Sequence, residues 1–288
     1  MQSIYELGAY LNRQALWTNN IIRKGYTSRL GILEETITDM QLLSMADQFG
    51  ENVLTKKFSR REEGSMSGAD WLWIIGEPGS WLPLLIQAKI VNPQTGNCQH
   101  LDYKNGNQRT QLLTYARQHR LVPLYCIYGN IPTDLELPDR FDKSITQREF
   151  WACSFITPRS VRLLSMRRLK CQRELIKYAI PWSLPFLDAT DSSSINGKLL
   201  ADSLEKSKYT YKDASTEKAE QLLKGRSDLT MRRKICWENL DAIQTVREKI
   251  PKNISQLFSI GFPDAASVPF SSASIISSTP IKEIMELK

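Results

Sequence analysis

The sequence predicts an α/β fold in which helices pack on the faces of a mixed β-sheet. Three observations predict it. Segments rich in aromatic and β-branched residues end at glycines, which is typical of buried strands. Polar segments between them repeat apolar residues at helical spacing. The resulting order of helix, strand, strand, helix and strand is typical of helices packed on a sheet.

The first predicted helix covers residues 33–46. Leu33, Ile37, Met40 and Leu43 recur at helical spacing there, and no proline interrupts them. A further strand is expected at about residues 54–60.

Two strands follow as a hairpin. The segment Asp70-Trp-Leu-Trp-Ile-Ile75 is rich in aromatic and β-branched residues and stops at Gly76. Residues 84–91 form the second apolar run after a Glu-Pro-Gly turn. We therefore expect an antiparallel pair of strands.

Three more elements complete the predicted sheet. Residues 107–119 form a polar helix on its surface, and residues 122–128 and 150–156 form strands. Thr157 then caps a helix whose first residue is Pro158, because proline lacks the N–H that a first helical turn leaves unpaired.

The pattern changes beyond about residue 170. Two prolines in residues 180–187 exclude a regular helix or a central strand. Helical patterns follow near 213–224 and 235–248, and a Ser-rich stretch follows from Ser267. We expect a core at 1–170, a mainly helical C-terminal appendage at 171–260 and a loose Ser-rich tail at 261–288.

Composition narrows the possible chemistry. No apolar run has the length of a membrane helix and no signal peptide is evident, so we expect a soluble, cytoplasmic protein. The five cysteines include no CxxC pair, and the two histidines, His100 and His119, are too far apart for a helical metal pair. Hydrolytic chemistry would therefore depend on carboxylates, amides and lysines, which favours a metal ion with oxygen ligands.

Positive charge is concentrated in one segment. The net charge of +7 arises wholly within residues 151–250, and most of it lies between Arg159 and Lys177. Such a run predicts an anionic partner such as nucleic acid, with Arg167, Arg168 and Lys170 as candidate contacts. The alternative is an ordinary solvated helix face.

A pair of polar side chains interrupts the apolar strand at 84–91. Because side chains alternate along a strand, Leu84, Ile86 and Ala88 share one face while Gln87 and Lys89 share the other. Polar groups in a central strand must be satisfied or they destabilise the fold. The hairpin can bring the carboxylate of Asp70 beside Gln87.

These residues resemble the signature of the PD-(D/E)XK nucleases. Gly68-Ala69-Asp70 followed by Gln87-Ala88-Lys89 is similar to the D…(D/E/Q)-x-K motif, with Gln in place of the second acid. Gln111-Leu-Leu-Thr-Tyr115 is similar to the QxxxY element of the RecB-like branch, with Gln108 about one turn earlier. An acid on the preceding helix is usual in that superfamily, and Glu34, Glu35 and Asp39 are available. The resemblance covers roughly residues 30–130.

The resemblance implies a restriction-endonuclease-like core and a Mg²⁺- or Mn²⁺-dependent DNA endonuclease, with a role in bacterial defence or restriction. It implies Asp70, Gln87 and Glu35 as metal ligands, with Glu34 as the alternative helical acid. Lys89 would orient the attacking water and offset developing negative charge. Gln111 and Tyr115 would position the substrate or a metal-bound water.

Several alternatives stay open. The fold could be catalytically inactive and serve as a nucleic-acid-binding or assembly module, or its substrate could be RNA. Activation could require a homodimer or a regulatory partner protein. Singly, Lys89 could extend from a sheet edge, Asp70 could cap a strand, and Tyr115 could be half-buried core.

Overall fold

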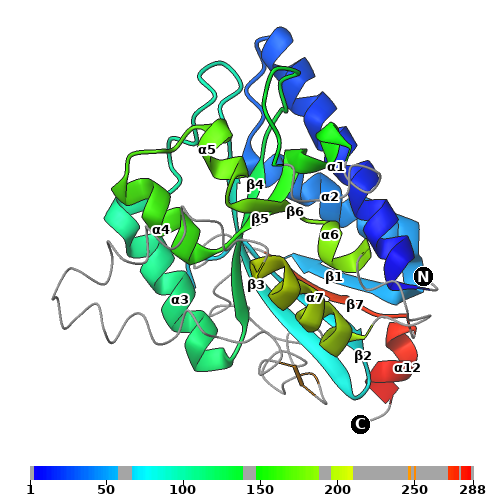
Figure 1. The fold of residues 1–288 in the computed structure, drawn as a ribbon. Helices are drawn as coiled ribbons and strands as arrows, with labels where there is room; N and C mark the ends of the chain where they lie inside the picture. The colour runs from blue at the N-terminus through cyan, green and yellow to red at the C-terminus, as the bar shows by residue number, and fades with distance from the viewer. Residues whose placement is uncertain are drawn as a thin grey trace, which may run out of the picture.

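The computed structural model describes residues 3–57, 67–138, 147–187, 196–209, 246–247, 250, 272–278 and 280–286. Within them, seven strands form one mixed sheet in the order β1-β7-β2-β3-β4-β5-β6, flanked by helices (Figure 1). The strands are β1 (Val53–Lys57), β2 (Trp71–Glu77), β3 (Ser80–Ile90), β4 (Val122–Tyr128), β5 (Cys153–Ile156), β6 (Ala179–Pro181) and β7 (Ser272–Ile276). This confirms the predicted α/β class, and the arrangement is consistent with a restriction-endonuclease-like core.

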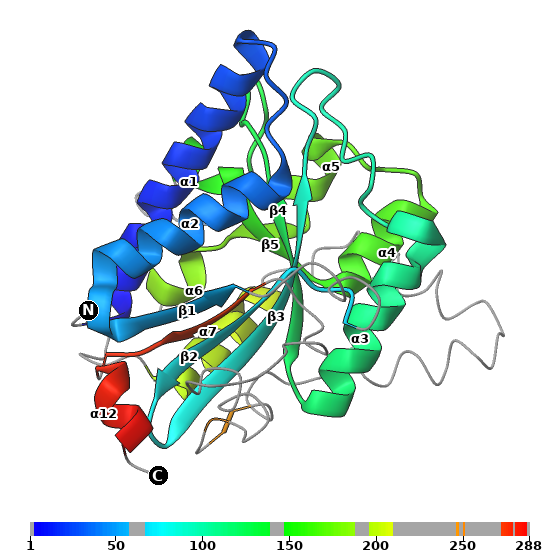
Figure 2. The same cartoon turned by 180° about the vertical axis from the view of Figure 1, so that it is seen from behind.

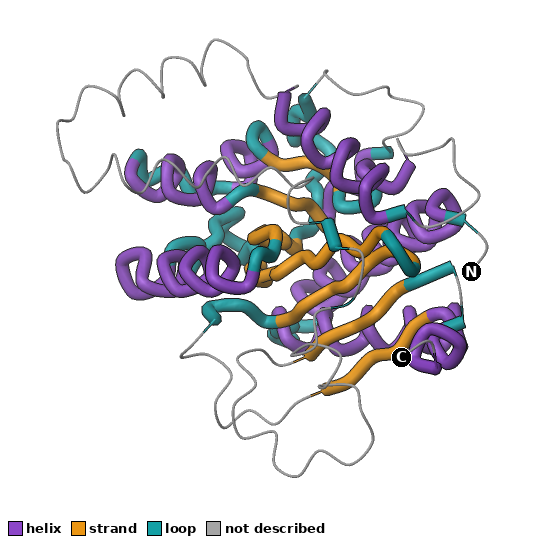
Figure 3. The backbone as a smooth tube through the Cα atoms, turned by 90° about the horizontal axis from the view of Figure 1, so that it is seen from below, coloured by secondary structure: helices purple, strands orange, loops and turns teal. Residues whose placement is uncertain are grey.

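Helices cover both faces of the sheet, so the strands form a middle layer (Figures 2 and 3). One face packs against α1 (Ile4–Thr27), α2 (Glu34–Phe49), α6 (Leu184–Leu187) and α7 (Gly197–Tyr209). The other face packs against α3 (Asn107–His119), α4 (Pro158–Met166), α5 (Gln172–Ile176) and α12 (Ile281–Glu286). Short 3-10 helices connect elements at η1 (Gly50–Asn52), η2 (Tyr103–Gly106) and η3 (Arg148–Ala152).

Strand β3 has different partners on its two sides. It pairs antiparallel with β2, as the hairpin predicts, and parallel with β4. Leu84, Ile86 and Ala88 lie in the core of the α1 and α2 face, whereas Leu85 lies in the core of the α3 face. The predicted alternation is therefore confirmed, and it directs Gln87 and Lys89 away from the first core.

Most elements upstream of residue 170 lie where the sequence predicts them. The predicted bounds of α3 and β4 are those observed. Thr157 caps α4 by accepting a hydrogen bond from the Ser160 N–H at 3.2 Å, with Pro158 in the first turn. Strand β5 starts later than expected because residues 148–152 form η3.

The long helix α1 was not expected. It has 24 residues, and its side chains at Leu7, Leu11 and Ala15 are fully buried against the sheet. Its buried positions recur at helical spacing, but they include the polar residues Thr18 and Asn19, which interrupt the apolar pattern of the sequence.

The expectation of a loose tail is wrong for residues 272–276, which form β7. This strand lies between β1 and β2, antiparallel to the first and parallel to the second. Ile275 and Ile276 are fully buried, one in each core, and Thr55 and Ser274 share a hydrogen bond at 3.0 Å. The serines are small enough to pack within the sheet. Their polarity is typical of a linker, which is why the sequence predicted a loose tail.

The sheet also continues past residue 170, because β6 pairs with β5. The helical patterns at 213–224 and 235–248 lie outside the described residues, apart from residues 246 and 247. There, Arg247 forms an isolated bridge with Trp81. In the described parts of the chain, every helix is too short or too polar to cross a membrane.

Candidate active site

The site lies beside the start of β2, where the pairing of β2 with β3 stops. The Asp70 N–H donates to the Ile86 carbonyl at 2.9 Å just before β2 begins, whereas β3 continues to Ile90 beside β4. Beyond Ile86, none of the described strands lies beside β3 on the side that faced β2. The backbone of Ala88 is therefore available there to side chains.

The carboxylate of Asp70 fills this position. Its Oδ2 accepts from the Ala88 N–H at 2.6 Å and from the Gln87 amide. Burial raises the pKa of Asp70 to about 7, Lys89 acts in the opposite direction, and Glu34 and Glu35 raise it further. So high a pKa means that the positive charge near this enclosed carboxyl group is too small to stabilise its ionised form fully.

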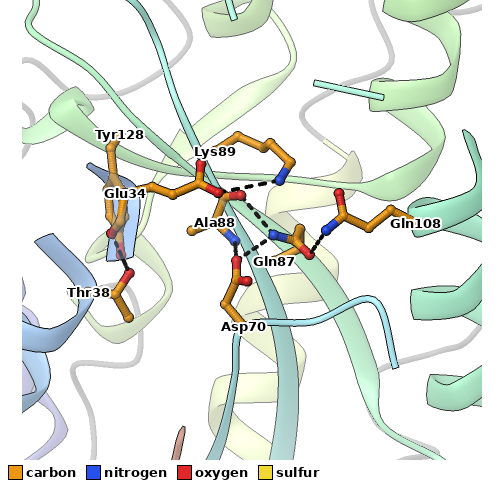
Figure 4. A network of polar contacts seen from close by, with 8 residues as sticks. All are labelled: Glu34, Thr38, Asp70, Gln87, Ala88, Lys89, Gln108 and Tyr128. Carbon is orange, nitrogen blue, oxygen red and sulfur yellow. Dashed lines mark hydrogen bonds and ion pairs between the residues drawn. The ribbon is translucent and has the colours of Figure 1, made fainter. Parts of the chain in front are cut away.

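Gln87 links Asp70 to helix α3. Gln87 is 1% exposed, and its Nε2 donates to Asp70 and to the Ala88 carbonyl at 3.0 Å. Its Oε1 accepts from Gln108 Nε2 at 2.7 Å. Gln108 Oε1 is buried without a hydrogen-bond partner. Figure 4 shows this chain of polar groups from Asp70 through Gln87 to Gln108.

Lys89 meets an acid from the other face of the sheet. Its side chain is 5% exposed, and Nζ lies 3.6 Å from Glu34 Oε1 at the start of α2 (Figure 4). This residue is Glu34 rather than the predicted Glu35, which is exposed and acts on Asp70 more weakly. The rotation of α2 is fixed by Thr38, whose hydroxyl shares a hydrogen bond with the Tyr128 hydroxyl at 3.1 Å.

Gln111 and Tyr115, the residues predicted on α3, lie about one and two turns after Gln108, which donates a hydrogen bond to Gln87. Tyr115 is partly buried against the core of the α3 face, and burial raises its pKa to about 12. The centroids of its ring and the His119 ring are 4.2 Å apart. Gln111 lies beside Gly68. The side chain that bonds Gln87 is Gln108, one turn earlier.

Close packing of Gly68 on α3 sets this geometry. Gly68 has a φ of +64°, and a Cβ there would lie 2.3 Å from the Gln108 carbonyl oxygen and 2.9 Å from the Leu112 nitrogen. Only glycine permits that approach. The glycine two residues before Asp70 was the sequence signal that could have pointed to the role of Gln108.

One residue of the basic run pairs with the loop after β3. Arg167 and Arg168 are exposed at the end of α4. The Lys170 carbonyl accepts from the Cys98 N–H at 2.9 Å. Burial raises the pKa of the Cys98 thiol to about 12, whereas Lys89 and Lys170 act in the opposite direction and Glu34 raises it further. The backbone of Lys170 is thus joined to the segment that borders Lys89.

The donor set suits a hard divalent cation. The described residues contain no group of three or more His, Cys, Asp and Glu side chains placed to hold a metal. A metal would therefore depend on Asp70 and Glu34 together with neutral oxygens, of Gln87 and the Ala88 carbonyl. Gln87 now turns its nitrogen to Asp70, and a half-turn of the amide would present its oxygen instead. The Gln108 amide would have to turn with it, because its Nε2 now faces Gln87 and its Oε1, which has no hydrogen-bond partner among the described residues, would then accept from the Gln87 nitrogen.

Comparison with known proteins places the chain in one family. Residues 7–267 match the model of a family described as a family of unknown function (DUF6615), and the chain belongs to that family. No curated protein and no solved structure matches the chain.

Proposed function

We propose that this protein is a metal-dependent nuclease that hydrolyses phosphodiester bonds, with DNA as the favoured substrate. The observation that supports the proposal most is the convergence of Asp70, Gln87 and Lys89 where β2 begins and β3 continues past it, with Glu34 across from Lys89. The resemblance to the PD-(D/E)XK signature adds to it. In the reaction, water attacks phosphorus, one phosphorus–oxygen ester bond breaks, and the departing oxygen takes up a proton as the water loses one.

Each side chain has a role that follows from its surroundings. Asp70 and Glu34 would hold Mg²⁺, with the Gln87 amide oxygen and the Ala88 carbonyl as neutral donors. When bound, the ion supplies a Lewis acid that polarises the phosphate and makes water more nucleophilic. Lys89, buried beside both acids, would orient the attacking water and offset negative charge on the phosphate. Gln108 would hold the Gln87 amide in position.

The basic residues support a polyanionic substrate. Arg167 and Arg168 are exposed at the end of α4, and the backbone of Lys170 pairs with the loop that borders Lys89. Neutralising all three should weaken DNA binding and reduce its salt dependence, because fewer counterions are released.

Cleavage of labelled DNA tests the proposal directly. We expect cleavage in Mg²⁺ and none in EDTA, and we expect Asp70→Asn and Lys89→Met to lower the rate at least 100-fold. Lys198→Met, at an exposed lysine on α7, is the matched control and should cut like wild type. Wild type that cuts neither DNA nor RNA in Mg²⁺ or Mn²⁺ would exclude the enzyme.

A second function is favoured by the orientation of the Gln87 amide. With its nitrogen turned to Asp70, the amide satisfies the carboxylate without a metal. A protein that binds nucleic acid in a salt-dependent way but never cuts would be a binding or assembly module built on this fold.

A further inference from the structure

A pocket opens beside the ion pair of Lys89 and Glu34. It has a volume of about 730 Å³. One wall is the last turn of α1 and the connector to α2, at residues 25–32, and the other is the loop after β3, at residues 91–100. Figures 1 and 2 both show these two segments rising side by side at the same end of the molecule.

The end of α1 and the connector contribute a flat ring, an apolar surface and a positive charge. Tyr26 and Leu30 line the pocket; Tyr26 is 49% exposed and Leu30 is 65% exposed. Arg29, which lies between them in sequence, also lines the pocket. An exposed ring in a pocket offers a face on which another planar group can stack.

The loop after β3 contributes hydrogen-bonding groups. Gln94, Asn97 and Gln99 are exposed amides in the pocket wall, and His100 follows them. Amides donate and accept hydrogen bonds, as the edges of nucleobases do. Among the described residues that line the pocket, Glu34 is the one carboxylate, and Lys89 pairs with it.

We infer that this pocket binds an unpaired nucleotide next to the phosphate that Lys89 faces, so that the preferred substrate is a single strand rather than a duplex. The inference rests on the proposed function. The volume lies within the range of about 300–1,000 Å³ that encloses a single compact ligand. In a duplex the faces of each base are covered by its neighbours, so the Tyr26 ring could not stack on a base unless that base left the helix.

Two variants remove the pocket in different ways. Tyr26→Ala deletes the stacking ring, and its matched control is Tyr5→Ala, which removes a tyrosine that is 56% exposed at the other end of α1. Gly31→Trp adds a large side chain at a residue that lines the pocket and where a Cβ meets no atom within 4 Å, so it is designed to obstruct the pocket, and Gly31→Ala is its control. All four variants should unfold at the temperature of wild type.

Binding is measured by fluorescence anisotropy in EDTA, with a labelled single strand and a hairpin duplex, each as DNA and as RNA. Cleavage of the same oligonucleotides is followed in Mg²⁺. We expect wild type to bind a single strand at least tenfold more tightly than the duplex. Tyr26→Ala and Gly31→Trp should abolish that preference, while both controls retain it. A mixture of mononucleotides should not compete at the strand's concentration.

Equal binding of strand and duplex by wild type, or an unchanged preference in both pocket variants, would overturn the inference. Competition by mononucleotides as strong as that by the strand would also overturn it, since the pocket would then hold a free nucleotide. If the preference appears but nothing is cut, the proposed hydrolysis fails while the inference about the bound strand holds.

Discussion

At Asp70, the fold encloses a carboxyl group that its neighbours do not fully neutralise. Lys89 is the cation that opposes the effect of burial, yet Lys89 is also paired with Glu34. Proteins commonly accumulate perturbed carboxyl groups at sites that bind a cation or transfer protons. The pKa of Asp70 therefore gives the site a distinct pH dependence.

Asp70→Asn should stabilise the metal-free protein at neutral pH. Because the pKa of Asp70 is raised in the folded state to about 7, its contribution to stability is complete below the pKa of the unfolded chain, about 3.9, and is lost as the pH rises to about 7. The melting temperature of Asp70→Asn minus that of wild type, measured in EDTA, should grow between pH 4 and pH 8. A difference that is constant with pH would refute the raised pKa.

Gln87→Glu should make the protein more dependent on metal. A second carboxyl group directly beside Asp70 lowers the stability of the metal-free protein by about 1–3 kcal/mol through repulsion and burial, and a divalent cation relieves it. Thermal unfolding with and without Mg²⁺ tests this. The increase in melting temperature on adding Mg²⁺ should exceed that of wild type, and an equal or smaller increase would show that no metal lies between the two residues.

Sequence reasoning reached the residues whose placement depends on local geometry. Gln87 and Lys89 followed from strand alternation, and Asp70 followed from the hairpin. The choice between Glu34 and Glu35 could not follow, because it depends on the rotation of α2 about its axis. A contact between Thr38 and Tyr128, 90 residues apart, fixes that rotation.

Among the elements, the junction of α3 with the segment before β2 determines how the amides meet. Gly68 lets the first turns of α3 approach the chain just before Asp70. The sequence predicts the bounds of α3 correctly. It does not show that α3 packs against Gly68, because that contact forms only in the folded structure. The sequence therefore suggested Gln111 and Tyr115, whereas the hydrogen bond from α3 to Gln87 is made by Gln108.

Gly68→Ala should separate α3 from the site. Its matched control is Gly96→Ala, since Gly96 has nearly the same φ, +66°, but a Cβ there meets no atom within 4 Å. The control should lose about 1–2 kcal/mol of unfolding free energy from backbone strain alone. Gly68→Ala should lose at least about 2 kcal/mol more in chemical denaturation, because the added atom meets backbone. Equal losses would show that the approach of α3 is not tight.

For the whole molecule, a strand from the C-terminal part of the chain completes one side of the sheet. Strand β7 lies between β1 and β2, so the first strand of the sheet reaches β2 only through residues more than 200 positions later. Five residues rich in serine carry too weak a pattern to predict this pairing from sequence. The general α/β class was predictable because the strands from β2 to β5 are strongly apolar and close in sequence.

A chain that ends at residue 271 should fail to fold, because it would expose the facing edges of β1 and β2. A chain that ends at residue 286 keeps β7 and α12 and is the control. Ile275→Ala provides a milder test, and it should lose about 2–4 kcal/mol of unfolding free energy since Ile275 is fully buried. Cooperative unfolding of the 271-residue chain at the temperature of the control would contradict the observed sheet order.

The proposed hydrolysis requires that the polar groups where β2 begins hold a divalent cation, and metal binding tests this without knowledge of the substrate. Mn²⁺ binding is measured by electron paramagnetic resonance, at pH 8, in wild type and Asp70→Asn. We expect about one tightly bound ion per wild-type chain and at least a tenfold weaker affinity in Asp70→Asn. Equal affinity in the two proteins, or no bound ion in wild type, would contradict the claim.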